Sequence, residues 1–157
     1  MKESLKLTFL VNALSWLKIP LLAFCAPKVI EISDQRSVVR IGLGYRTKNH
    51  LNVMYFGALA MGAELSIALK AVQNIQKSGK KIDFIFKDFH CEFLKRADGD
   101  VHFICEQAGA VAELIEQSLS SKERLEGTFH GAAFVAGQLD QPIMKYSLTL
   151  SVRNRGL

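Results

Sequence analysis

The stretch from residue 55 to residue 76 constrains the fold more than any other part of the sequence. Its apolar residues recur on one helical face: Phe56, Leu59, Ala60, Ala63, Ile67, Ala71 and Ile75. Between His50 and Lys70 the only charged side chain is Glu64, whose neighbours on the helix are small or apolar. Because a carboxylate buried without partners is costly, an acid at this position indicates a functional group.

Short strands surround this helix on both sides in the sequence. Alternating apolar residues predict strands over residues 29–32, 38–43, 82–93, 101–106, 128–135 and 143–152, and a second helix over 108–120. In the third strand the apolar phase changes at Asp88, which predicts a β-bulge near Lys87 and Asp88. The small residues Gly57, Ala58, Gly62 and Ala63 let a sheet approach the central helix closely. We therefore expect an α+β fold in which one antiparallel sheet wraps around a long helix.

The N-terminal segment needs a separate interpretation. Two lysines precede an apolar run over residues 7–17, which superficially resembles a signal peptide. Lys18 and Pro20 interrupt the run, and Phe24 before Cys25 is a poor cleavage site, so secretion or lipid anchoring is the weaker alternative. The run is too short to span a bilayer, so we expect no stable membrane insertion. Residues 1–26 are expected to form a helical segment packed on a single domain over 27–157.

Composition narrows the classes of protein further. With 157 residues and 49% hydrophobic content, the chain can bury one sizeable core. The formal charge of +5 is spread along the chain, and no nucleic-acid-binding motif is present, so nucleic acid is not an expected partner. Three widely spaced cysteines, Cys25, Cys91 and Cys105, favour a reducing, cytoplasmic setting over a disulfide framework. The histidines show no metal-ligand spacing, so neither a metal nor another cofactor is expected.

With this order of elements, the stretch 49–64 resembles the hotdog-fold thioesterase superfamily, in particular phenylacetate-pathway-like thioesterases and the relatives grouped as DUF4442. The resemblance covers most of residues 27–153. In those thioesterases an Asn precedes the central helix, a His-Gly-Gly element opens it, and an acid follows on it. Asn49, Gly57 and Glu64 stand at the corresponding positions, whereas Tyr55 replaces the His and Phe56 replaces the first Gly. The resemblance thus implies the hotdog fold, here with an extra N-terminal helix.

The resemblance also implies a set of roles. Glu64 would act as general base or as nucleophile, Asn49 would position water or the carbonyl, and the N–H groups near Gly57 would stabilise the oxyanion. The further expected substrate-binding residues are His50, Tyr55, Phe56 and Asp83. The alternative from the residues alone is that Gly57 serves packing and Glu64 makes a dimer contact.

The implied substrate is an acyl thioester of coenzyme A or acyl carrier protein, bound with its acyl chain beside the helix. Family members build the site between two subunits, so a homodimer or a dimer of dimers is expected. The rival function is a non-catalytic acyl-ligand-binding hotdog protein, which the replacement of His by Tyr55 motivates. A dehydratase of the same fold is less favoured, because the His-plus-acid pair of such enzymes is not evident at the helix start.

Overall fold

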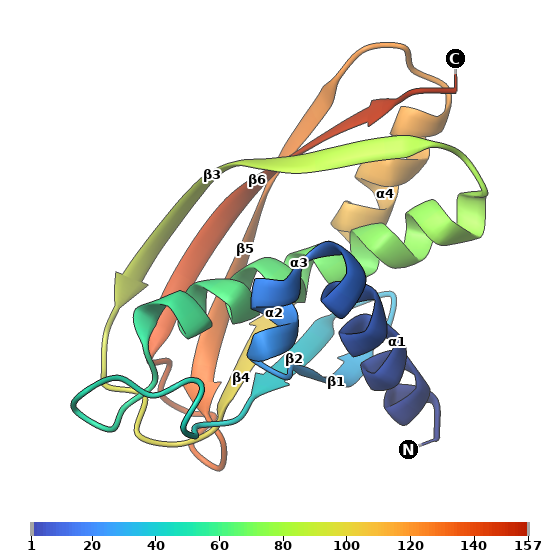
Figure 1. Ribbon diagram of the computed structural model, residues 1–157. Helices are drawn as coiled ribbons and strands as arrows, with labels where there is room; N and C mark the ends of the chain where they lie inside the picture. Colours follow the sequence, from blue (N-terminus) through green and yellow to red (C-terminus); the bar gives the residue numbers. More distant parts are fainter. Residues whose placement is uncertain (1, 157) are drawn as a thin grey trace.

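The computed structural model describes residues 2–156 as one antiparallel sheet curled around a helix (Figure 1). The helices are α1 (Lys2–Lys18), α2 (Pro20–Phe24), α3 (Phe56–Ser78) and α4 (Ala108–Leu119). The strands are β1 (Lys28–Ile32), β2 (Ser37–Ile41), β3 (Ile82–Phe93), β4 (Val101–Cys105), β5 (Leu125–Val135) and β6 (Met144–Asn154). Their order in the sheet is β1-β2-β4-β5-β6-β3, which leaves β1 and β3 as the two edges. The predicted elements are all present, with ends that differ by a few residues.

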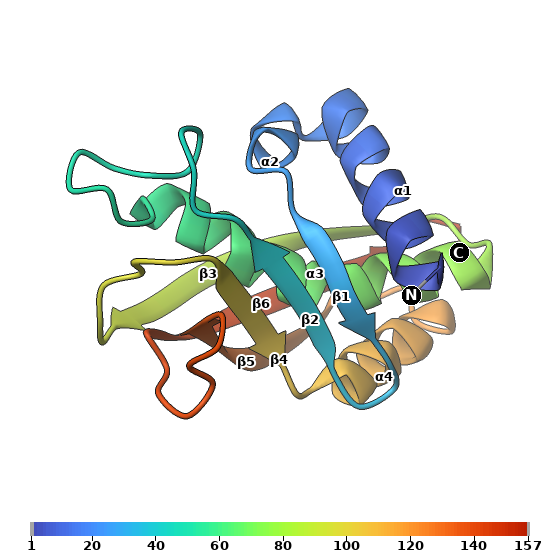
Figure 2. The same ribbon diagram turned by 90° about the horizontal axis from the view of Figure 1, so that it is seen from below.

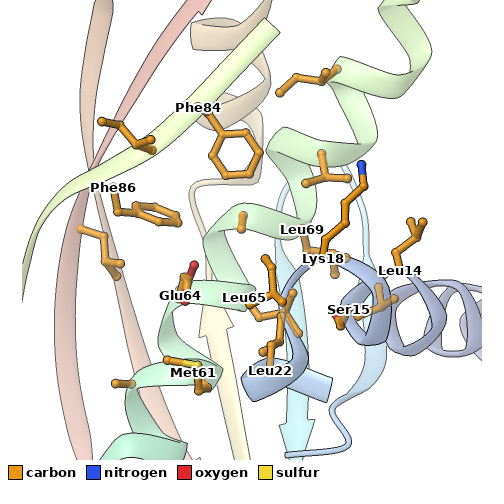
Figure 3. Close-up of a pocket in the computed structure, with 18 of the residues that line it drawn as sticks. Leu14, Ser15, Lys18, Leu22, Met61, Glu64, Leu65, Leu69, Phe84 and Phe86 are labelled. Atoms are coloured by element: carbon orange, nitrogen blue, oxygen red, sulfur yellow. The ribbon is translucent and has the colours of Figure 1, made fainter. Parts of the chain in front are cut away.

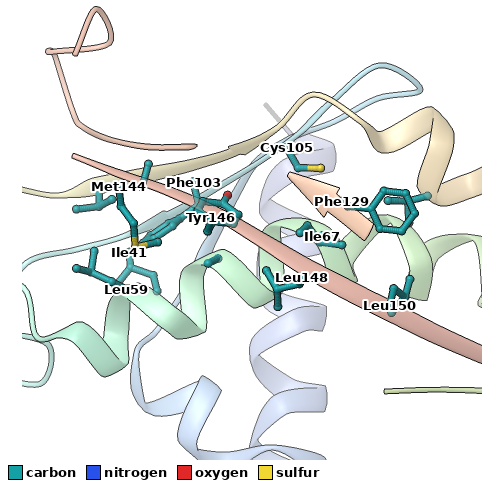
Figure 4. Close-up of a cluster of buried hydrophobic side chains, with 14 of the residues drawn as sticks. Ile41, Leu59, Ile67, Phe103, Cys105, Phe129, Met144, Tyr146, Leu148 and Leu150 are labelled. Atoms are coloured by element: carbon teal, nitrogen blue, oxygen red, sulfur yellow. The ribbon is translucent and has the colours of Figure 1, made fainter. Parts of the chain in front are cut away.

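The core lies between α3 and the concave face of the sheet (Figure 4). Fully buried side chains from the strands, such as Phe103, Met144 and Leu150, pack against Ala63 and Ile67 of the helix. Small residues bring the helix this close, since Gly62 leaves no room for a Cβ beside the Phe103 ring. The helix stops at Gly79, whose φ of 63° is the left-handed conformation that glycine adopts without strain. The predicted helix on 55–76 is therefore confirmed, two residues longer at its end.

Strand β3 contains the predicted bulge. Phe86 pairs with Leu150 and Asp88 pairs with Thr149, so Lys87 is the extra residue. The Asp88 carboxylate accepts a hydrogen bond from the Thr149 backbone N–H at 3.1 Å, which holds the irregular pairing in place. The bulge moves the apolar phase from Phe86 to Phe89, and both side chains then reach the same side of the sheet. An edge strand with this kink points its aromatic residues at the open side of α3.

The N-terminal helices α1 and α2 cover part of that open side, beside β1 (Figure 2). Two polar side chains of α1 fix the helix to the sheet. The Thr8 hydroxyl accepts from the Val29 N–H at 3.0 Å, and Asn12 Nδ2 donates to the Pro27 carbonyl at 2.8 Å. Pro20 lies at the first position of α2, where a missing N–H costs nothing, and separates the two helices. Within residues 2–156, no helix is long and apolar enough to cross a bilayer.

Candidate functional site

A cavity of about 800 Å³ lies between the N-terminal helices, α3 and the edge strand β3 (Figure 3). Helix α1 supplies Leu14, Ser15 and Lys18, and α2 supplies Leu22. Helix α3 supplies Met61, Glu64, Leu65 and Leu69, and β3 supplies Phe84, Phe86 and Phe89. Its volume is within the range of small-molecule sites, and its wall is mainly aliphatic or aromatic, with Ser15, Lys18, Glu64 and Gln76 as its polar members. The cavity therefore suits an apolar ligand.

Glu64 is the acidic group of this cavity. Its carboxylate lies among Met61, Leu65 and Phe86, half-buried on the face of α3 that points away from the core (Figure 3). Within the described residues it has neither a hydrogen-bond donor nor an ion-pair partner. Removal from water penalises the charged form, so burial raises the pKa of Glu64 above its ordinary value of 4.5. A carboxylate of raised pKa, open to a cavity, is suited to accept a proton from a bound molecule.

The start of α3 presents unpaired backbone donors. Tyr55 is the N-cap residue, in an extended conformation, and no side chain caps the helix. The N–H groups of the first turn, Phe56 to Ala58, consequently have no intrahelical acceptor. Together with the positive end of the helix dipole they can stabilise an anion or a polarised carbonyl. Tyr55 covers this turn, because a Cβ on Gly57 would lie 2.6 Å from its ring carbon Cε1.

The loop before α3 holds Asn49 in a defined turn. The Asn49 side-chain oxygen accepts a hydrogen bond from the Leu51 N–H at 2.8 Å, and the Asn49 backbone N–H donates to the Val53 carbonyl at 2.8 Å. Only the oxygen of the side-chain amide is used among the described residues, so the two Nδ2 hydrogens can meet a ligand. His50, next to it, is exposed. Neither residue lines the cavity of Glu64 within the same chain.

The other expected substrate-binding residues lie in different places. Tyr55 and Phe56 are half-exposed at the helix start, with their ring centroids 4.9 Å apart. Asp83 is the second residue of β3; it pairs with Arg155 at 2.8 Å and does not line the cavity. A single chain thus gathers Gly57, Tyr55 and Phe56 at one point and Glu64 in the cavity, but does not bring Asn49, His50 or Asp83 to Glu64.

The cavity walls from α1, α2 and β3 were not singled out from the sequence. The signal was present, since Val11, Leu14, Ser15, Lys18 and Leu22 recur at helical spacing and Phe84 and Phe86 alternate on β3. Their meeting across α3 depends on how the sheet curls, which no local pattern specifies. Among residues 2–156, no cluster of three or more His, Cys, Asp or Glu is placed to hold a metal ion.

Burial of Glu64 makes the stability of the protein depend on pH. The folded state holds the Glu64 proton more tightly than the unfolded chain, so this carboxyl costs nothing below its unfolded pKa near 4.5. The cost grows as the pH rises and is complete above the raised folded pKa. We expect the free energy of unfolding of Glu64→Gln, relative to wild type, to increase across this window and then level off. Urea unfolding of both proteins at a series of pH values measures this difference in the free energy of unfolding. The prediction would be contradicted if the difference stayed constant with pH.

Solved structures share this architecture over nearly the whole chain. A protein of unknown function from Chlorobaculum tepidum has a TM-score of 0.79 at 9% identity, covering 96% of this chain and 96% of its own. A candidate thioesterase from Shewanella oneidensis has a TM-score of 0.76 at 12% identity, with 93% and 96% covered. A thioesterase from Haemophilus influenzae has a TM-score of 0.67 at 12% identity, with 94% and 90% covered. A comparison with curated proteins finds no match.

These likenesses and the topology define the class: the chain has the hotdog fold, with an additional N-terminal helix, as the sequence resemblance implied. Residues 8–126, most of the chain, match the family described as "Domain of unknown function (DUF4442)". The protein belongs to this family.

Proposed function

We propose that the protein is an acyl thioesterase in which Glu64 activates the attacking water. The observation that carries the proposal is an unpaired carboxyl of raised pKa in a mainly apolar cavity of about 800 Å³. The names of the structural neighbours from Shewanella oneidensis and Haemophilus influenzae support the same reaction class. The substrate is a thioester of coenzyme A or of an acyl carrier protein, with its acyl chain in the cavity.

The reaction needs a water molecule, a base and oxyanion donors around the thioester carbonyl. Ionised Glu64 takes a proton from water as the water oxygen bonds to the carbonyl carbon. The free N–H groups at a helix start stabilise the oxyanion that forms. The intermediate then releases the thiolate, which takes up the proton, and the products are a carboxylic acid and a thiol. Water exclusion by the aliphatic wall strengthens both electrostatic effects.

The helix start that completes the site belongs to a second subunit. Gly57 and Glu64 are seven residues apart on α3, which separates them by about 10 Å along the axis, too far for both to serve one carbonyl. Edge strand β3 offers a place for a second copy: it is 12 residues long, and it exposes Ile85 and Phe93. Pairing of two β3 strands would bring the α3 start and Asn49 of one subunit toward the cavity of the other. The proposed enzyme is therefore a homodimer.

A complementation experiment tests this arrangement. The purified protein should release thiol from members of an acyl-CoA panel, and the variants Glu64→Gln and Asn49→Asp should each be impaired. Asp at position 49 keeps an oxygen that accepts from Leu51 and replaces the Nδ2 donors by a second, charged carboxylate oxygen. In a hybrid dimer one of the two shared sites is intact, so an exchanged equimolar mixture of two inactive variants should regain about a quarter of wild-type activity.

The outcomes of this experiment separate the alternatives. A mixture no more active than its components would show that Glu64 and Asn49 do not serve one site across subunits. Tight acyl-CoA binding by wild type with no thiol release would replace the proposal by a non-catalytic acyl-binding function. A mass of a single chain by sedimentation would contradict the homodimer.

A further inference from the structure

The outward side of the N-terminal helices carries large apolar side chains with no protein covering them. We call this surface the outer face; it consists of Leu5, Phe9, Trp16, Leu17, Leu21 and Phe24. Leu17 is 82% exposed, Phe9 is 76% exposed, and each of the six is at least 46% exposed. Scattered exposed apolar residues are ordinary, but six large ones on two consecutive short helices indicate an interaction surface.

The same helices are apolar on their inward side as well. Val11, Leu14 and Leu22 line the cavity of Glu64, on the opposite side of the helices from the outer face. Packing against the domain explains the inward residues. It does not explain Phe9, Trp16 or Leu17, which face away from the domain. The outer face therefore has a different occupant.

The charges around the outer face indicate the chemistry of that occupant. Residues 1–28 contain four lysines, Lys2, Lys6, Lys18 and Lys28, and one acid, Glu3. Lys6 is exposed, on the same side of α1 as Phe9. Arg46, from the loop after β2, lies with its guanidinium carbon 5.6 Å from the centre of the Phe24 ring. Apolar side chains including a Trp, in a segment with more cations than acids and beside Lys6 and Arg46, complement an anionic lipid surface.

We propose that the outer face docks on an anionic phospholipid bilayer, with α1 lying in the membrane surface rather than crossing it. The six apolar side chains enter the interface, and Lys6 and Arg46 meet the headgroup phosphates. A second copy of the chain is a poorer occupant, because an isologous contact would bring two lysine-bearing faces together. Docking also places the cavity directly beneath the membrane-bound helices, where apolar molecules are concentrated.

Vesicle sedimentation tests the docking with the full-length protein. We expect binding to vesicles of phosphatidylcholine mixed with phosphatidylglycerol, and much weaker binding to phosphatidylcholine alone. Binding should fall as salt is raised, because the headgroup attraction is screened. Lys6→Gln should lower the partition coefficient for anionic vesicles about fivefold, the effect of one cation near such a surface.

The apolar contribution is tested by a double variant and a matched control. Phe9→Gln combined with Leu17→Gln should lower partitioning at least about tenfold, since two exposed side chains lose their burial in the interface. Leu139→Gln changes an equally apolar side chain that is 57% exposed in the turn between β5 and β6, and it should leave binding unchanged. All three side chains are exposed, so unfolding curves should match wild type; they are measured on the same samples.

Two results would overturn the proposal. One is equal partitioning of the double variant, the Leu139→Gln control and wild type, including the case in which none of them binds anionic vesicles. The other is a change in sedimentation mass, without lipid, that follows the outer-face substitutions, which would assign the surface to a second copy. Because vesicle binding is measured without a thioester, failure here is independent of the proposed hydrolysis.

Discussion

Replacing Glu64 by glutamine is expected to lower the kcat of acyl-CoA hydrolysis by about 10²- to 10⁴-fold, the usual contribution of a general base. Glutamine has nearly the same shape as glutamate and still occupies the space between Met61 and Phe86. It cannot take the proton of the attacking water. Binding of the acyl chain, which depends on the apolar wall, should change far less, so KM should remain within a few-fold of wild type.

The pH profile gives this prediction a second readout. The wild-type rate should rise with pH through the raised pKa of Glu64, because only the ionised carboxylate acts as the base. The acid limb should therefore lie above the ordinary range of a glutamate. Glu64→Asp, which retains a carboxylate on a shorter side chain, should recover part of the lost rate and keep an acid limb. The residual activity of Glu64→Gln should lack that limb.

A control separates catalysis from general charge effects. Glu116→Gln removes one negative charge from the exposed side of α4 and should leave kcat and KM unchanged. The assay is thiol release from acyl-CoA, with folding checked by urea unfolding. If both Glu64→Gln and the control Glu116→Gln hydrolysed thioesters at the wild-type rate, Glu64 would not be the general base.

The position of Glu64 could be predicted from the sequence because the signal is local. Helical spacing places this single acid on a face of α3 that is otherwise made of small and apolar residues. The surroundings of Glu64 could not be predicted in the same way. Its neighbours Phe84 and Leu14 come from elements far apart in the sequence, and only the curl of the sheet brings them together.

The fold could be predicted from the sequence more fully than the site could, for a related reason. Alternation along the strands, the phase change at Asp88 and the Gly79 stop are each properties of neighbouring residues, and each is present in the structure. The candidate site residues, in contrast, do not all lie together in one chain. The Asn49 side chain accepts a hydrogen bond within its own turn, and Asp83 pairs with Arg155. Within one chain neither residue lines the cavity of Glu64. In the proposed homodimer, the groups that meet Glu64 would come partly from a second subunit, and one sequence does not specify how two copies associate.

Substituting Gly62 by alanine is expected to destabilise the protein by about 2 kcal/mol, although alanine is the better helix former. The new methyl group would overlap three carbons of the Phe103 ring, which is fully buried between the helix and the sheet. Overpacking of this kind costs about 1–3 kcal/mol, or more where the neighbour cannot move. Alanine is favoured over glycine in a helix by about 1 kcal/mol. The steric overlap is the larger effect, so the substitution should destabilise the protein.

Gly44→Ala provides the matched control. A Cβ at Gly44 meets no atom within 4 Å, and its φ lies outside the left-handed range. The substitution should therefore be neutral or stabilising by up to about 1 kcal/mol, through loss of freedom in the unfolded chain. Urea or thermal unfolding measures both variants, and Gly62→Ala should lower Tm by about 4–8 °C. A Gly62→Ala protein as stable as wild type would mean that Phe103 can yield, and that the close approach of β4 to α3 is not what requires a glycine at this position.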